Sequence, residues 1–158
     1  MNKIREVAAI LALSLTMPGS SAQSAQVDHL TQGQLIQQAQ LLEQKAAESG
    51  SASAKLADYP NHFTMIALRT RTGAAEIHLH YADVFFVVRG KATLVTGGTL
   101  VDPQTVSPGE TKGTSVNGGT RLALAKGDFV HIPANVPHQL LLEKSSEFVY
   151  FVIKVQEQ

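Results

Sequence analysis

The sequence predicts an all-β fold, a sandwich or barrel, that follows a helical arm. From His62 onward, about eight short runs rich in β-branched and aromatic residues are separated by Gly, Pro, Asn or Asp, a spacing typical of sandwiches and barrels. Before residue 60 the chain is rich in Gln and Ala, and its apolar residues follow helical spacing. The change of period near residue 60 is the basis of the prediction.

The chain has 158 residues, 44% of them hydrophobic, and this length and composition predict one compact domain. Thirteen basic residues balance thirteen acidic ones, so no broad attraction to nucleic acid or to an anionic membrane is expected. There are no cysteines. Disulfides and thiolate metal sites are therefore excluded, and His, Asp, Glu and backbone groups are left as metal ligands.

Residues 1–22 have the pattern of a signal peptide. Lys3 and Arg5 precede an apolar run over residues 7–17, which is too short to span a bilayer, and small residues lead to a cleavage site after Ala22. The chain has no twin-Arg pair, which favours Sec-type export unfolded. We therefore expect a periplasmic or secreted protein with no membrane contact after signal removal. The alternatives are an N-terminal buried helix and an uncleaved anchor.

Residues 23–60 are predicted to form a helical arm that covers one sheet face or takes part in dimer contacts. Thr31 and Gln34 can form a capping box, and Ser49-Gly50-Ser51 is a strong stop signal. The apolar residues at helical spacing are Leu30, Leu35, Ile36, Ala39, Leu42 and Ala46. The remaining residues, 61–158, are predicted to form the β-barrel domain.

The barrel domain is predicted to contain strands over residues 62–69, 75–80, 84–88, 91–95, 120–124, 129–132, 139–142 and 148–155. Residues 99–117 are polar and include Pro103, Pro108 and Gly109. We therefore expect a long excursion there, with at most short edge strands.

Three histidines are the strongest sign of chemistry. His78 and His80 occupy positions i and i+2 of a predicted strand, where side chains project to the same face. His138 lies in a second strand-like segment after a Pro-rich turn and could close a metal site with them. Three imidazoles suit Zn, Mn, Fe, Ni or Cu, and affinity order alone does not choose among these metals. A metal-free barrel is the alternative.

At these residues the sequence resembles the cupin superfamily, whose fold is a small jelly-roll barrel or double-stranded β-helix. The first cupin motif is matched at Gly73, His78, His80 and Gly90, with four rather than five residues between the first two. The second motif is matched at Gly127, Pro133 and His138, but Asn135 and Leu142 replace its second Gly and its final Asn. Asn tolerates the left-handed conformation that a turn Gly would supply.

The resemblance implies that His78, His80 and His138 bind a divalent metal together with a Glu of the first motif. Counted forward from His80, the position of that Glu holds an apolar residue. Counted back from Gly90, it holds Asp83. Asp83 is therefore the candidate fourth ligand, and three histidines with water are the alternative if its shorter side chain fails to reach.

Other polar side chains near the histidines are candidates for catalysis. Glu76 shares a face with the histidine pair by strand alternation, and Tyr81 adjoins the pair in sequence. Together with Asp83 they are the candidate catalytic residues, as a base or in proton transfer. Arg69 and Arg71 are expected to be solvated rather than to meet a carboxylate.

Three functions are consistent with these features. The first is an exported cupin that binds one divalent metal and acts as an enzyme on a small organic substrate, of dioxygenase, isomerase or lyase type. The second is a non-catalytic periplasmic protein that binds a metal or a small molecule. The third is a structural barrel that mediates dimerisation, and the resemblance itself implies a homodimer. Because this superfold hosts many activities, the fold alone does not choose among them.

Overall fold

The computed structural model describes residues 27–157, which form twelve strands and two helices. In chain order these are α1 (Gln32–Gln40), α2 (Glu43–Ser49), β1 (Ser51–Asp58), β2 (His62–Arg69), β3 (Ala75–His78), β4 (Tyr81–Thr96), β5 (Thr99–Val101), β6 (Gln104–Ser107), β7 (Glu110–Gly113), β8 (Ser115–Asn117), β9 (Thr120–Ala125), β10 (Phe129–Ile132), β11 (His138–Leu141) and β12 (Phe148–Gln156). The predicted signal peptide, residues 1–22, lies outside the described residues. Within residues 27–157, no helix is long and apolar enough to cross a membrane.

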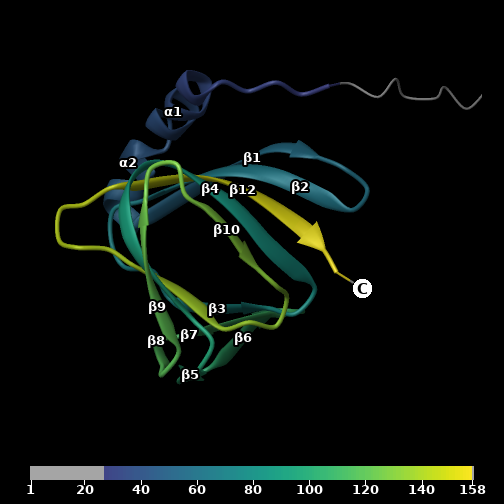
Figure 1. Ribbon diagram of the computed structural model, residues 1–158, viewed down its shortest axis with the longest axis vertical. Coiled ribbons are helices and arrows are strands. Elements are labelled where there is room, and N and C mark those ends of the chain that lie inside the picture. Colours follow the sequence, from purple (N-terminus) through teal and green to yellow (C-terminus); the bar gives the residue numbers. More distant parts are fainter. Residues whose placement is uncertain (1–26, 158) are drawn as a thin grey trace, which may run out of the picture.

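Ten strands form one curled antiparallel sheet, a half-barrel whose upper layer contains β1, β2, β12 and β4 and whose lower layer contains β3, β7 and β6 (Figure 1). The hydrogen-bonded path runs β1-β2-β12-β4-β11-β3-β7-β6, and β9 and β10 both pair with β4. Strands β5 and β8 form a separate two-stranded sheet. Because β1 and β6 end the path without pairing with each other, the barrel is open between these edges.

Strand β4 joins the two layers by changing partners at Gly90. Its first part pairs with β10 and β12, and its last six residues pair with β9. Gly90 has a φ of +90°, and a Cβ at this position would lie 1.9 Å from the Glu147 carbonyl oxygen. The ladder between β12 and β4 also carries an irregularity at Val149/Tyr150, which is the kind of bulge that increases local twist. Glycine is therefore required where β4 passes between layers.

The two helices cover the outer face of the upper layer (Figure 1). The predicted capping box is present, because the Thr31 side chain accepts from the Gln34 backbone N–H and the Gln34 side chain accepts from the Thr31 backbone N–H. The predicted single helix is divided into α1 and α2 by a turn at residues 41–42, and α2 ends at Gly50, whose φ is +87°. The apolar residues buried between the helices and the sheet include Leu35, Ala39, Ala46, Ile66, Leu68, Val88 and Val149.

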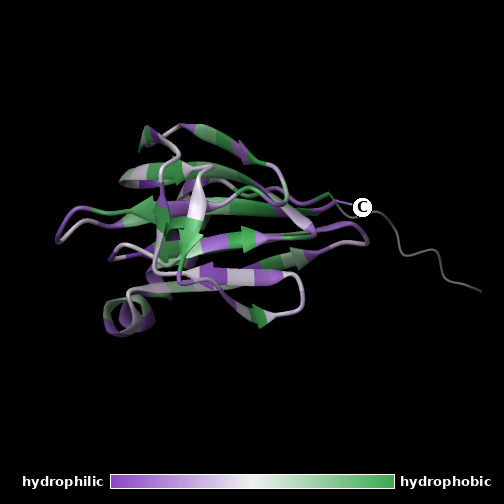
Figure 2. Cartoon of the chain, turned by 90° about the horizontal axis from the view of Figure 1, so that it is seen from below, coloured by the Kyte–Doolittle hydropathy of each residue, from purple (hydrophilic) through white to green (hydrophobic). Residues whose placement is uncertain are grey.

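The inner face of the same strands forms the barrel core with the lower layer. On β2, Ala67 points into this core while Ile66 and Leu68 point toward the helices, as period-two alternation requires. Apolar residues, green in Figure 2, lie mainly on the strands, and the connecting loops are largely polar. The core includes Phe85, Val87, Leu94, Leu124, Ile132, Leu140, Phe148, Tyr150 and Val152. The predicted all-β jelly-roll barrel is confirmed.

Several strands differ from the predicted ones. Residues 51–58 form β1, a strand of the sheet, although the arm was expected to extend to residue 60. Residues 84–88 and 91–95 belong to the continuous β4, because Arg89-Gly90 continues the ladder with β12 instead of forming a turn. Residues 99–117 contain four short strands, as expected for the excursion, but β7 pairs with β3 and so reaches the histidine region.

Candidate metal centre

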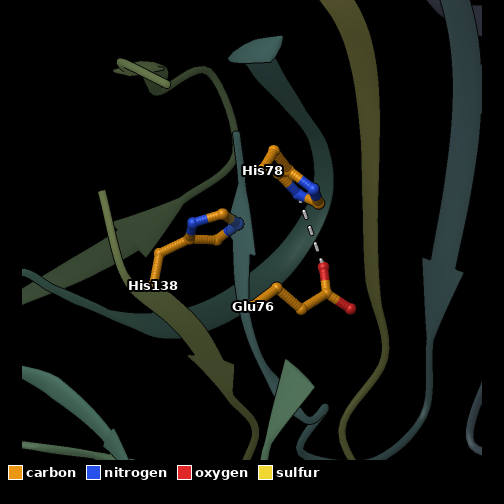
Figure 3. Close-up of side chains that lie close together, drawn as sticks. All are labelled: Glu76, His78 and His138. Carbon is orange, nitrogen blue, oxygen red and sulfur yellow. Dashed lines mark ion pairs between the residues drawn. The ribbon is translucent and has the colours of Figure 1, made fainter. Parts of the chain in front are cut away.

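Three potential metal ligands, Glu76, His78 and His138, converge inside the half-barrel (Figure 3). Glu76 and His78 lie two residues apart on β3 and therefore share a face. His138 begins β11 and is the direct cross-strand partner of Glu76. One ligand atom from each residue lies within 4.8 Å of the others. Alternation on one strand and register with its neighbour thus bring the three donors together.

His80 is outside this group, which differs from the three-histidine arrangement expected from the sequence. Strand β3 ends at His78, and the chain bends through Leu79 and His80. The bend follows from loop contacts: the Asn135 backbone N–H donates to the His78 carbonyl, and the Leu79 N–H donates to the Gly109 carbonyl. Period-two projection therefore stops at His78, and the His80 side chain is exposed and packs beside Gly109. Asn135 has a φ of +64°, the left-handed conformation expected of it.

Both histidines form hydrogen bonds through Nδ1, so their Nε2 atoms are available to a ligand at the centre of the site. His138 Nδ1 lies 3.0 Å from the Val136 carbonyl oxygen, and His78 Nδ1 lies 2.5 Å from Glu110 Oε2. Because these oxygens accept, each Nδ1 carries the proton and donates, and each neutral ring keeps its lone pair on Nε2. Carboxylate and carbonyl partners of this kind orient the histidine ligands of metal sites and fix their tautomer.

Asp83 approaches the same centre from the upper layer. Its Oδ2 lies 3.5 Å from His78 Nε2 and 3.7 Å from His138 Nε2, and its side chain is 11% exposed. Its other oxygen forms an ion pair with Lys154, the cross-strand partner of Asp83 on β12. Asp83 thus lies beside both histidines, with one oxygen held by a lysine, and is not one of the three residues of the ligand group.

The pKa values of these groups follow from their burial and charges. Burial would raise the pKa of Asp83, but the neighbouring His78 and the charge of Lys154 lower it to about 2. Burial would lower the pKa of His78, but Asp83 and Glu110 raise it above its ordinary value. Burial lowers the pKa of His138. At neutral pH, Asp83 is therefore ionised and His138 is neutral and able to ligate.

Glu76 is held in place on both sides. Its Oε1 accepts from Lys112 Nζ at 3.1 Å, and its Oε2 lies 3.7 Å from His78 Nε2. Burial would raise the pKa of Glu76, but the charges of Arg69 and Lys112 lower it below its ordinary value. Glu76 is therefore an ionised oxygen ligand, with one oxygen fixed by a cation and the other directed at the histidines.

A pocket of about 350 Å³ opens beside the group, and Glu76, His78 and Asp83 all line it. Its walls come from β2, β3, β4, β7 and β12, and from α2 and β1 next to the open side of the barrel. Tyr81, a predicted catalytic residue, does not line this pocket. Its ring lies edge-on to Phe63, with a centroid distance of 5.8 Å.

Sequence reasoning missed several residues of the site. Glu110 and Lys112 lie on β7, in the excursion that was expected to hold only short edge strands. Lys154 reaches the site from β12, and Arg69 lines the pocket although it was expected to be solvated. Alternation on their own strands does not reveal them, because their contacts depend on how distant strands pair.

The donor set fits a divalent metal. Among the residues that the structure describes, the buried Nε2 of His78 has no hydrogen-bond partner. A bound cation would satisfy this atom. Two imidazole nitrogens and one carboxylate match the ligand sets of catalytic zinc and of non-haem iron(II) sites. With three protein ligands, such a site keeps positions for water or substrate.

Comparisons with known proteins identify the fold. A scan of protein-family models finds no match for this sequence, and a search of curated proteins finds none either. The cupin domain of Cnp3 from Schizosaccharomyces pombe superposes with a TM-score of 0.51 at 9% identity, covering 68% of this chain and 65% of that one. TT1209 from Thermus thermophilus superposes with a TM-score of 0.51 at 13% identity, covering 70% of this chain and 87% of that one.

The chain therefore has the cupin fold, as the resemblance implied. The DMSP lyase DddQ from Ruegeria pomeroyi shares this architecture, with a TM-score of 0.50 at 14% identity over 68% of this chain. This chain covers only 48% of the DddQ chain. At such identities the likeness establishes the fold alone, so the chemistry must be argued from the site.

Proposed function

We propose that this chain is an exported metalloenzyme with a cupin fold. Glu76, His78 and His138 hold one divalent transition metal, and the substrate is a small organic molecule transformed by dioxygenase, isomerase or lyase chemistry. Export is supported by the signal-peptide pattern of residues 1–22. The proposal of a metal centre is supported by the geometry of the three donors.

One observation carries the proposal: the two histidines are preset as metal ligands. Each donates its Nδ1 proton to an oxygen, and each therefore aims an Nε2 lone pair at the space beside Glu76. A buried histidine with a purely structural role would form hydrogen bonds through both ring nitrogens. The buried Nε2 of His78 has no hydrogen-bond partner among residues 27–157. A metal held there supplies Lewis-acid polarisation or an activated water.

The surrounding side chains prepare the site for a substrate. Lys154 keeps Asp83 ionised beside both histidines, so Asp83 can accept a hydrogen bond from a substrate hydroxyl or from water. Because its pKa is about 2, Asp83 is a weak base at neutral pH, and we assign it an orienting role. Phe85 and Leu94 belong to the apolar barrel core and lie next to the site.

The alternative is a non-catalytic protein that binds a metal or a small molecule. A structural metal site is usually closed by four protein ligands, whereas this group has three and adjoins a pocket. A pocket of about 350 Å³ lies at the small end of the range for ligand sites. The three-ligand group beside a pocket favours a site that admits a small molecule over a closed metal site.

The metal assignment is tested by titrating Zn²⁺ and Mn²⁺ into the metal-free full chain by calorimetry. We expect one binding site per chain in the wild type and its loss in His78→Ala and His138→Ala. His80→Ala is the matched control, because His80 lies two residues from His78 but outside the group; it should bind metal like the wild type. Loss of binding in His80→Ala, or retention in His138→Ala, would overturn the assignment.

The enzyme proposal is tested by water-proton relaxation of the Mn²⁺-loaded protein. An open coordination position exchanges water with the solvent and therefore enhances relaxation above that of a fully ligated ion. We expect such enhancement, together with its quenching by small ligands that enter the pocket. A loaded protein with no enhancement would have a closed metal shell, which would favour the carrier function.

A further inference from the structure

The pocket beside the metal centre carries more positive charge than its acidic residues neutralise. Its lining includes four cations and two acids: Lys45, Arg69, Lys112 and Lys154, with Glu76 and Asp83. Each acid has its own lysine, through the pairs Lys112–Glu76 and Lys154–Asp83. Among the described residues, Arg69 and Lys45 form no ion pair with a carboxylate. The lining therefore has two more cations than acids, before any metal charge is added.

Arg69 is fixed in position by Tyr150. Its Nε donates to the Tyr150 hydroxyl at 2.9 Å, and Tyr150 is 8% exposed and belongs to the barrel core. This is the only hydrogen bond that the Arg69 side chain makes to the described residues, so the Nη1 and Nη2 groups keep their donors for another partner. That edge of a guanidinium presents two parallel N–H groups, which match the two oxygens of a carboxylate.

Arg69 also lies close to the metal ligands. It lines the pocket of about 350 Å³ with Glu76 and His78, and it lines a smaller interior cavity of about 30 Å³ with Glu76, Asp83 and His138. Arg69 also lines a pocket of about 290 Å³ with Gly73, Glu76 and Lys112. A molecule that reached the guanidinium through the pocket of about 350 Å³ would lie beside Glu76 and His78. Lys45 and Lys112 line the same pocket and would attract an anion into it.

Gly73, the first glycine of the cupin-like motif, makes room for this arginine. A Cβ at residue 73 would lie 2.1 Å from Arg69 Nη1 and 3.0 Å from its Cζ. The φ of Gly73 lies outside the left-handed region, so alanine is compatible with its backbone. Glycine is therefore required at residue 73 because a larger side chain would displace the guanidinium, and not because of the backbone conformation.

We infer that the substrate is a small carboxylate, which Arg69 binds through its Nη edge while another part of the molecule reaches the metal centre. Tyr150 and Gly73 are positioning residues that hold the guanidinium in place. This inference rests on the proposed function, because it names the class of molecule that the metal centre would act on.

The first test compares propanoate with propanamide, its neutral isostere, by calorimetry on the Co²⁺-loaded full chain. Because the metal itself prefers an anion, the decisive measurement is the difference between wild type and Arg69 variants. We expect Arg69→Gln to weaken propanoate binding about tenfold or more and to leave propanamide binding unchanged, while Co²⁺ still binds. Arg69→Lys, which keeps the charge but loses the planar fork, should fall between the two.

Gly73→Ala is the sharper variant, since it keeps the charge of Arg69 and moves only its guanidinium. We expect it to weaken propanoate binding as Arg69→Gln does, with normal circular dichroism and normal Co²⁺ affinity. Arg121→Gln, on the exposed β9, is the matched control for loss of one positive charge and should bind propanoate like the wild type.

The outcomes separate the two proposals. A wild-type protein that binds no Co²⁺ would overturn the metal centre, whatever the anion results. A wild type that binds Co²⁺, combined with equal propanoate affinity in wild type, Arg69→Gln and Gly73→Ala, would overturn the carboxylate site alone. If Gly73→Ala weakens propanoate binding as much as Arg69→Gln does, the position of the guanidinium, and not its charge alone, determines carboxylate binding.

Discussion

Acid should destabilise the metal-free protein through Asp83 in a predictable way. The pKa of Asp83 falls from an ordinary value of 3.8 to about 2 in the folded chain. At about 1.4 kcal/mol per pKa unit, this difference corresponds to about 2.4 kcal/mol of stability at neutral pH. Because the folded-state pKa is the lower one, the stabilisation is complete above about pH 5 and is lost as the pH falls through about 2.

The assay is urea unfolding of the metal-free protein, followed by circular dichroism between pH 5 and pH 2. We expect the wild type to lose about 2 kcal/mol more than Asp83→Asn over this range, since the variant lacks the titrating carboxyl. Asp58→Asn is the control, because the Asp58 ion pair with Lys55 is exposed and contributes little. Equal losses in the wild type and in Asp83→Asn would refute the assignment of this stability to Asp83.

Three further predictions concern the metal centre and the barrel. Glu110→Gln should weaken metal binding about 10- to 100-fold, because the carboxylate that orients His78 is lost; an unchanged calorimetric affinity would contradict that role. Metal affinity should rise with pH through the range in which His78 titrates, because protons compete with the metal for Nε2. The raised pKa of His78 extends this competition to higher pH than for an ordinary histidine. A pH-independent affinity would count against His78 as a ligand. Gly90→Ala should lower the free energy of unfolding by more than about 1 kcal/mol, because its Cβ would overlap the Glu147 carbonyl and its φ is positive; a melting temperature equal to that of the wild type would contradict this.

Local patterns predicted the framework of the fold and part of the site. Short runs rich in β-branched and aromatic residues, separated by turn residues, indicated the all-β fold, and the Thr31–Gln34 capping box indicated where α1 begins. His78 was recognised from its place on a strand, and Asn135 from its tolerance of a positive φ. These features depend on residues close in sequence, so the sequence contains the information that determines them.

Where a strand stops was not visible in the same way. The H-x-H spacing predicts that His78 and His80 share a face, but this holds only while β3 continues. The strand ends at His78 because loop partners from Gly109 and Asn135 take its next backbone groups. Two segments that are distant in sequence therefore decide that His80 faces solvent.

The sequence by itself determined an all-β chain with a capped helical arm and donors suited to a metal, because alternation, turn residues and side-chain chemistry are local properties. Only the tertiary structure decided which donors meet. The register of β11 on β3 places His138 opposite Glu76, and the pairing of β7 with β3 carries Glu110 to His78. Such contacts depend on the pairing of strands across the barrel, and one strand read alone does not specify its partner's register.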